Sequence, residues 1–380
     1  MTARLIYADS ERSADLYYAV GLFIPDPFLF VQDLSGRRHM VVSVLEFNRA
    51  CRLARVDQVH ELESLKRRYQ QQQGHEPAGN ADWMAWFLLE LDITTVMAPA
   101  DFPLLLADQL RRLGVVVTPC DGLFWPQRAC KTEEEVSLIE DALHLTAVAM
   151  ASGIDLIRAA AIGSDGWLYL DGQQLTSERV RGEIDAMLAR MGAEASHTIV
   201  CGGLLSADPH ESGHGPLAAH SPIILDVFPR VGRSGYWGDM TRTVCRGEAP
   251  QRLKAMWQAV RVGQQLAFGL IASGCSGRQI HDAVTESMAS AGFSTGITAE
   301  GVHFGFIHGT GHGLGLEIHE APRIGMRDAR LEQGHVVTVE PGLYYPDIGG
   351  VRLEDVVLVT ADGCRLLTPC LTQLPKELEL

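Results

Sequence analysis

Four acidic residues occupy matching places in two parts of this chain. Asp226 ends a run of apolar residues, and Asp239 follows it 13 positions later. Glu340 ends a second apolar run, and Glu354 follows it 14 positions later. An apolar strand, a turn and a returning strand would place the two acids of each pair on neighbouring strands. If the two hairpins face each other, all four carboxylates come together.

Four ionised carboxylates repel one another inside a protein, because a low dielectric strengthens the repulsion between like charges. Divalent cations remove this conflict, and two of them can share bridging carboxylates and activate water for hydrolysis. The alternative is four acids on solvent-exposed strands, but such strands alternate polar and apolar residues and these runs do not. The segment 307–320 adds His308, His312 and His319, one of which would complete the site with an imidazole nitrogen. The pattern therefore favours a two-metal hydrolytic site.

The elements that must position these residues follow position 131. Thr132 and Glu135 form a capping-box pattern that predicts a helix to about Arg158. Two further capped helices are expected 100 positions apart, beginning after Thr176 and after Ser276. Each is followed along the chain by an apolar strand that ends in an acid. This internal repeat predicts two similar halves.

The first part of the chain predicts a separate small α/β domain, with residues 120–130 as the linker. Apolar runs predict strands at 27–31, 40–45, 94–98 and 115–119, and helical periodicity predicts helices at 58–69, 81–91 and 102–113. At 380 residues the chain is too long for one ordinary core. We therefore expect an N-terminal domain at 1–125 and a catalytic domain at 131–380.

Composition argues against several other classes of protein. The formal net charge is −15, from 32 basic and 47 acidic residues, which disfavours binding to nucleic acid. No run of about 18 apolar residues is present to span a membrane, and the N-terminus lacks the apolar segment of a secretory signal. The eight cysteines form no Cys-x-x-Cys pair, which fits a reducing compartment. We expect a cytoplasmic protein with neither a nucleic-acid nor a membrane partner.

The chain resembles the pita-bread metallopeptidases, which include methionine aminopeptidases, Xaa-Pro aminopeptidases and Xaa-Pro dipeptidases. The resemblance covers about residues 131–380 and rests on five motifs in this order: Gly238-Asp239-Met-Thr-Arg-Thr243, His308-Gly-Thr-Gly-His312, His319-Glu320, Thr338-Val-Glu340-Pro-Gly and Arg352-Leu-Glu354-Asp355. It implies an α+β pita-bread catalytic domain with an internal pseudo-twofold repeat. The first domain is similar to the N-terminal α/β domain of the Xaa-Pro peptidases and of creatinase.

The resemblance also implies roles for single residues. It implies two divalent metal ions held by Asp226, Asp239, His312, Glu340 and Glu354. A carboxylate-rich set favours Mn²⁺, with Co²⁺, Zn²⁺ or Fe²⁺ as alternatives. Glu340 would also shuttle a proton, and His319 would stabilise the developing oxyanion. The other residues implied at the catalytic pocket are His210, and His308 and Arg352 as substrate-binding residues. We also expect a homodimer.

The activity that the resemblance implies is hydrolysis of the N-terminal peptide bond of short peptides, with proline in the second position. A methionine-aminopeptidase-like enzyme without a proline requirement is one alternative, but such enzymes usually lack the N-terminal domain. A creatinase-like amidinohydrolase and a non-catalytic binding module are the others, but both tend to have lost metal ligands that are all present here.

Two further features bear on the choice of substrate. A dipeptidase would need a cation to bind the free carboxylate of its substrate, and Arg327 and Arg330 are the candidates. The spacing of 13 between Asp226 and Asp239 also exceeds the 11 that is usual in the family. This difference predicts a longer turn, containing Pro229 and Arg230, at the rim of the pocket.

Overall fold

The structure is a computed structural model that describes residues 2–369, 374–375 and 377–380. The chain divides into two compact units, Met1–Pro126 and Gln127–Leu380. The division falls inside the segment expected to be a linker. Much of that segment belongs to the first unit, because Phe124 and Trp125 are buried in its core and the Trp125 indole N–H donates to the Asp15 carbonyl at 2.9 Å.

The first unit is a six-stranded sheet of order β4-β3-β2-β1-β5-β6 with helices on both faces. Its strands are β1 (Ala3–Ala8), β2 (Phe28–Gln32), β3 (Arg38–Val42), β4 (Gln58–Glu61), β5 (Thr95–Ala98) and β6 (Val116–Pro119). Its helices are α1 (Ala14–Val20), α2 (Val44–Leu53), α3 (Leu62–Gln73), α4 (Asn80–Glu90) and α5 (Leu104–Arg112). Alternate residues of the strands pack into two apolar clusters, one with α3, α4 and α5 and the other with α1 and α2.

Two of the predicted elements in this unit are partly wrong. The helix expected at 58–69 begins only at Leu62, because residues 58–61 form β4 and pair with the sheet edge at β3. The Glu61 carboxylate then caps α3 by accepting the backbone N–H groups of Glu63 and Ser64. The strand expected at 40–45 ends at Val42, and α2 begins at Val44. β1, α1 and α2 were not predicted.

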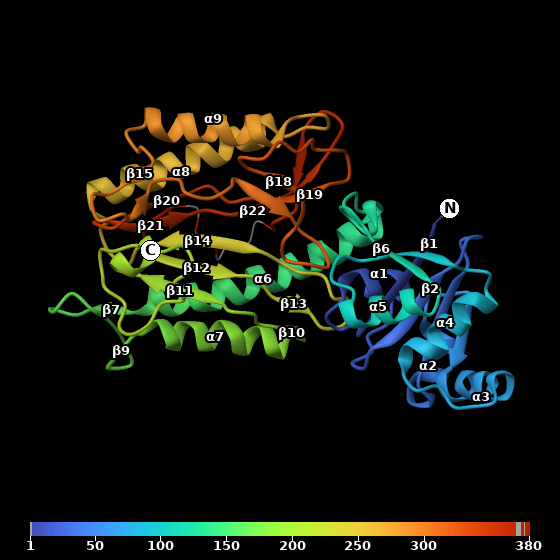
Figure 1. Cartoon of the computed structure of the whole chain (residues 1–380). Coiled ribbons are helices and arrows are strands. Elements are labelled where there is room, and N and C mark those ends of the chain that lie inside the picture. The colour runs from blue at the N-terminus through green and yellow to red at the C-terminus, as the bar shows by residue number, and fades with distance from the viewer. Residues whose placement is uncertain (1, 370–373, 376) are drawn as a thin grey trace. The chain divides into compact units, whose positions relative to one another are not determined.

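The second unit contains two helix-covered sheets (Figure 1). One sheet has the order β11-β12-β14, from β11 (Ile199–Gly202), β12 (Ile223–Val227) and β14 (Met240–Val244). It packs against α6 (Glu133–Ala159) and α7 (Ser177–Arg190). The other has the order β18-β17-β19-β22-β23, from β17 (Gly311–Gly313), β18 (Glu320–Ile324), β19 (Val336–Val339), β22 (Asp355–Val359) and β23 (Cys364–Leu366). It packs against α8 (Gln251–Leu270) and α9 (Gly277–Ser290).

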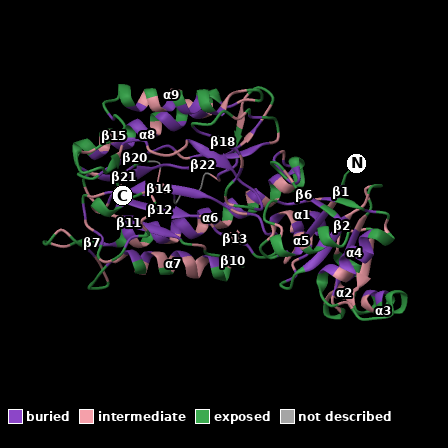
Figure 2. Cartoon of the chain, viewed as in Figure 1, coloured by how far each residue is buried: buried purple, intermediate pink, exposed green. Residues whose placement is uncertain are grey.

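Smaller ladders complete the second unit. A three-stranded ladder joins β7 (Ala161–Ile162), β8 (Leu168–Leu170) and β9 (Gln173–Gln174). Three pairs join β10 (Ala193–Glu194) to β13 (Arg230–Val231), β15 (Gly296–Ile297) to β16 (His303–Phe304), and β20 (Gly342–Tyr345) to β21 (Gly349–Arg352). Figure 2 shows that the strands of the two main sheets are mostly buried, whereas α7 and α9 present exposed outer faces. The edge strand β23 is partly exposed.

The predicted capped helices of the second unit are confirmed. Thr132 and Glu135 form the capping box of α6. Thr176 and Ser276 cap α7 and α9, which cover the same positions shifted by 100. Within the described residues α6 is long and apolar enough to cross a membrane by composition, yet 56% of its most apolar stretch is buried inside the protein, as in a core helix.

Candidate metal centre

Each pair of acids lies on two neighbouring strands, as the spacing predicted. β12 pairs with β14 in a register that sets Asp226 opposite Thr241, and Asp239 directly precedes β14. β19 pairs with β22, and Glu340 directly follows β19 while Glu354 directly precedes β22. The second hairpin differs from expectation in one respect, because residues 349–352 form β21 and pair with β20 before the chain returns along β22.

The two pairs of acids and His312 converge in one cluster. The Nε2 atom of His312 lies 3.2 Å from Oε1 of Glu340 and 3.7 Å from Oδ2 of Asp239. The potential ligand atoms of Asp239, His312 and Glu354 all lie within 4.8 Å of one another. Asp226 joins the cluster through the Thr241 hydroxyl, which lies 2.9 Å from its Oδ1 atom and 2.8 Å from Oε2 of Glu354.

Burial makes this cluster unfavourable for negative charge. It raises the pKa of Asp239 and of Glu354 well above their ordinary values, and the neighbouring carboxylates raise both further. Burial, aided by Asp226, also raises the pKa of Glu340 to about 7. Nη2 of Arg352 donates to Oδ2 of Asp226 at 2.7 Å. The charge of Arg352 also acts on Asp239, Glu340 and Glu354, but it does not offset the effect of their burial.

His312 shows that the cluster is suited to a metal ion. Its Nδ1 atom lies 3.1 Å from the Gly313 carbonyl, which can only accept, so Nδ1 carries the ring hydrogen. Burial lowers the pKa of His312 to about 3, which keeps the imidazole neutral. The lone pair on Nε2 therefore faces carboxylate oxygens, an arrangement that becomes favourable with a cation between them. The donor chemistry of the five residues fits a divalent metal site.

The cluster lines a cavity of about 660 Å³ that also contains groups suited to binding a peptide. His319 packs its ring edge-on against the His312 ring, with the centroids 4.4 Å apart. Burial lowers the pKa of His319, so this ring is neutral as well. The other predicted pocket residues His210, His308 and Arg352 also line the cavity, together with Arg323, Arg327, Ile199, Phe228, Ile307, Ile318 and Ile324.

His308 and Arg352 are connected to each other through Tyr344, which sequence reasoning missed. Nδ1 of His308 lies 2.8 Å from the Gly309 carbonyl, so its Nε2 atom accepts the Tyr344 hydroxyl at 2.9 Å. Nη1 of Arg352 donates to the same hydroxyl oxygen at 2.7 Å. Both side chains thus have protein partners, and their contact with substrate stays a prediction.

Thr241 was also missed, although a signal for it was present. It stands two positions after Asp239 at the start of β14, so it faces the same side of the sheet as that acid. No local pattern in the sequence pointed to Tyr344, whose role depends on the pairing of β20 with β21.

The longer turn after Asp226 forms a structured ladder. Arg230 and Val231 form β13, which pairs with Glu194 and Ala193 of β10. Phe228, just before this ladder, lines the cavity. The turn therefore contributes an aromatic ring to the cavity, whereas Arg230 is not among the lining residues.

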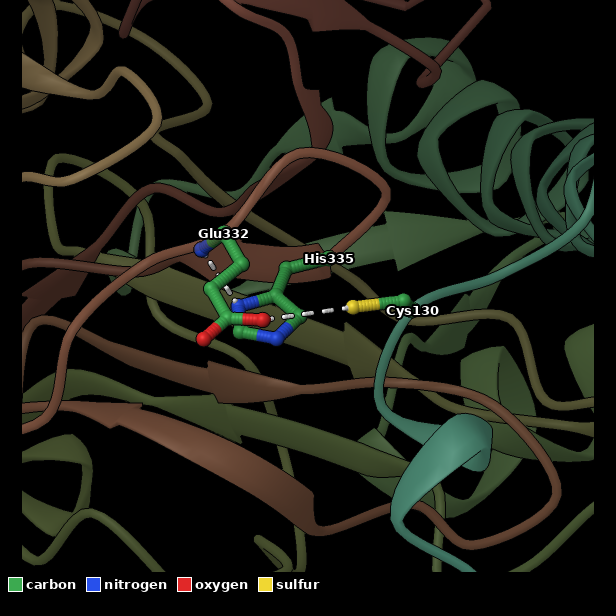
Figure 3. Close-up of side chains that lie close together, drawn as sticks. All are labelled: Cys130, Glu332 and His335. Atoms are coloured by element: carbon green, nitrogen blue, oxygen red, sulfur yellow. Dashed lines mark hydrogen bonds between the residues drawn. The ribbon is translucent and has the colours of Figure 1, made fainter.

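A second group of metal-ligand residue types, Cys130, Glu332 and His335, lies elsewhere in the second unit (Figure 3). The thiol of Cys130 donates to Glu332 at 3.8 Å, and Nδ1 of His335 accepts the Glu332 backbone N–H at 2.9 Å. The second hydrogen bond places the ring proton on Nε2, the atom that would otherwise be available to a metal. Burial also raises the pKa of the Cys130 thiol. The three residues therefore form a hydrogen-bonded group with a structural role.

The fold and the site together define a metallohydrolase-type protein with a buried carboxylate and histidine centre. Residues 137–361 match the sequence model of metallopeptidase family M24, and the chain belongs to this family.

Individual relatives agree with this assignment. The uncharacterized peptidase YqhT of Bacillus subtilis is 32% identical over 254 residues, which cover 66% of this chain and 64% of that protein. The Xaa-Pro dipeptidase of Pyrococcus furiosus is 30% identical over 252 residues, which cover 65% of each. The chain therefore spans slightly less than two thirds of the length of these relatives.

Solved structures show the same mixed α/β fold over the whole chain. The X-Pro aminopeptidase of Thermotoga maritima has a TM-score of 0.81 at 23% identity and covers 100% of this chain and 98% of its own. The Xaa-Pro dipeptidase of Bacillus anthracis has a TM-score of 0.80 at 25% identity, with coverage of 100% and 95%.

Proposed function

We propose that this chain is a dinuclear metal-dependent exopeptidase that hydrolyses the N-terminal bond of short Xaa-Pro peptides. The observation that carries the proposal is a cluster in the wall of a peptide-sized cavity, where Asp239, Glu340 and Glu354 lie near the Nε2 lone pair of His312. Asp226 joins this cluster through the Thr241 hydroxyl. Relatives that are named Xaa-Pro dipeptidase and X-Pro aminopeptidase support it. We also propose that the two helix-covered sheets are related by the pseudo-twofold repeat of the pita-bread fold.

The proposed metal ligands are Asp226, Asp239, His312, Glu340 and Glu354. Four hard carboxylates and one imidazole favour Mn²⁺, although Co²⁺, Zn²⁺ or Fe²⁺ would also suit this set. When bound, the ions would supply the positive charge that activates water and polarises the scissile carbonyl.

The residues of the chain would perform the proton transfers and the positioning. Glu340, which lines the cavity beside His312, would accept a proton from the attacking water and pass it to the leaving amine. His319 is neutral, so its single N–H group would donate to the oxyanion that develops on the carbonyl. His210 is exposed at the cavity and would contact substrate there.

The cations of the cavity favour dipeptides as substrates. Arg323 and Arg327 line the cavity and are exposed, so either would bind the free carboxylate of a dipeptide. Arg330, the other arginine expected from the sequence, is not among the lining residues and donates to the Gly274 carbonyl at 3.1 Å. The apolar side chains Phe228 and Ile318 are suited to a proline ring.

A comparison of three peptides tests this function. With Mn²⁺ present we expect Ala-Pro to be hydrolysed fastest, Ala-Pro-Ala more slowly and Met-Ala-Ala least. Arg323→Ala or Arg327→Ala should raise KM for Ala-Pro about 10-fold or more, the value of one charge-assisted hydrogen bond, and leave Ala-Pro-Ala little changed. Arg330→Ala is the matched control and should behave as wild type. Failure to cleave any of the three peptides would contradict the proposal, and preference for Met-Ala-Ala would favour an enzyme without a proline requirement. The expected homodimer and cytoplasmic location stay predictions.

A further inference from the structure

We infer that Glu320, bound between Arg128 and Lys131, is a positioning residue that sets the orientation of His319 in the cavity. The inference rests on the proposed function, because it assigns His319 a place at the reacting carbonyl. It adds three residues that contact neither the metal centre nor the cavity and that nonetheless control catalysis.

The three side chains form a buried ion cluster. Oε1 of Glu320 accepts from Nη2 of Arg128 at 2.6 Å, and its Oε2 atom accepts from Nζ of Lys131 at 2.9 Å. Their side chains are only 6%, 10% and 2% exposed. Burial acts to raise the pKa of Glu320, but the charges of Lys131 and Arg128 outweigh it and lower that pKa below its ordinary value. Buried ion pairs contribute little net stability, so such a cluster is better explained by a need for fixed geometry.

Glu320 holds the backbone around His319 through its strand pairing and through its carboxylate. It directly follows His319 and lies opposite Gly313 in the β17–β18 pairing, next to the ligand His312. Its Oε1 atom also accepts the Glu317 backbone N–H at 3.0 Å, which closes the turn that contains His319. Gly315 makes room for the carboxylate, because a Cβ atom there would lie 2.8 Å from it.

His319 depends on this backbone for its orientation. Its ring makes no hydrogen bond to any other residue that the structure describes, and its residue is exposed. The ring packs edge-on against the ring of His312. A movement of the backbone at 317–320 would therefore move the imidazole directly, and a displacement of about 1 Å can cost roughly 100-fold in rate.

The backbone at Lys131, one of the two cations, is held by hydrogen bonds to a neighbouring segment. Cys130 forms an antiparallel bridge with His335, and the Lys131 backbone N–H donates to the Gly334 carbonyl at 2.7 Å. Figure 3 shows Cys130 facing Glu332 and His335 at this point. Thr132, the next residue, caps α6. Lys131 thus extends from a backbone that is held on both sides.

A double-mutant cycle tests whether Glu320 acts through His319. Glu320→Gln should lower kcat for Ala-Pro about 100-fold, with KM changed less than about threefold. His319→Ala should also lower kcat, and the double variant should be no slower than the slower single variant, because the two residues act as one unit. If the two losses multiply, Glu320 does not act through His319 and the inference is wrong.

Conservative and control variants separate positioning from folding. Lys131→Arg keeps the charge and should retain most activity, whereas Lys131→Met should behave as Glu320→Gln does. Thr132→Ala weakens the neighbouring helix cap without touching the ion cluster, and it should leave kcat unchanged. All variants should bind as much metal as wild type. A Lys131→Met variant with normal kcat would overturn the inference even if Glu320→Gln does not fold.

A spectroscopic readout keeps this test independent of peptide hydrolysis. The Cε1–H signal of His319 in the zinc-loaded full chain, assigned by its loss in His319→Ala, should shift in Lys131→Met and not in Thr132→Ala. If wild type cleaves no peptide, the proposed function fails. The His319 signal would still test whether the Glu320 ion cluster sets the orientation of His319. An unshifted His319 signal in Lys131→Met would overturn the inference.

Discussion

Replacing Glu340 with glutamine is expected to lower kcat for Ala-Pro by at least about 100-fold, with a much smaller change in KM. The loss follows from removal of the proton shuttle, which acts mainly in the transition state and contributes roughly 100- to 10,000-fold in comparable cases. A carboxylate beside the attacking water can take up its proton and release it to the leaving amine. Glutamine cannot do so, although its amide oxygen can still coordinate a metal.

The measurement is steady-state kinetics at saturating Mn²⁺, together with the metal content of the variant. Glu300→Gln, an exposed substitution outside the cavity lining, is the matched control and should have wild-type kinetics. Near-normal turnover by Glu340→Gln at full metal occupancy would show that another group moves the proton.

Asp239→Asn should change the stability of the metal-free and metal-loaded protein in opposite ways. Without metal, burial and the charges of Glu354, Asp226 and Glu340 raise the pKa of Asp239, so removing its charge relieves repulsion. The metal-free variant should therefore melt at the same temperature as wild type or higher. With metal, wild type gains about 2.7 kcal/mol when free Mn²⁺ is 100 times Kd, and the variant should gain far less.

The same repulsion predicts a pH dependence for the metal-free protein. The folded pKa of Glu340 is about 7 against an ordinary value of 4.5, so the folded state binds the proton more tightly than the unfolded state. The contribution of Glu340 to the free energy of unfolding should thus fall as pH rises from about 4.5 through about 7, and the raised pKa values of Asp239 and Glu354 act in the same direction. Asp239→Asn should make this fall shallower. Thermal melts with EDTA and with Mn²⁺ across this pH range test both predictions. An Asp239→Asn variant that Mn²⁺ stabilises as much as wild type would exclude Asp239 as a ligand.

The position of the candidate metal centre could be predicted because its residues stand at strand ends. Asp226 and Glu340 each follow an apolar strand, and the spacing to Asp239 and Glu354 is that of a returning strand. Helix caps such as Thr132 could also be predicted from the sequence, since a cap depends on residues within one turn.

Features that depend on contacts between residues far apart in the sequence could not be predicted from it. Residues 58–61 have no strong strand pattern and form β4 only because the edge of β3 is available. Tyr344 connects His308 to Arg352 only once β20 and β21 have paired. Likewise, nothing near Lys131 in the sequence indicates that its partner is Glu320, which lies 189 positions away.

The metal content of the wild-type protein tests the central claim most directly. After loading with Mn²⁺ and removal of the excess, elemental analysis should find two metal ions per chain. Treatment with EDTA should remove both ions and abolish the hydrolysis of Ala-Pro, and Mn²⁺ or Co²⁺ should restore it. A protein that retains full activity after chelation, with no metal detected, would contradict the account.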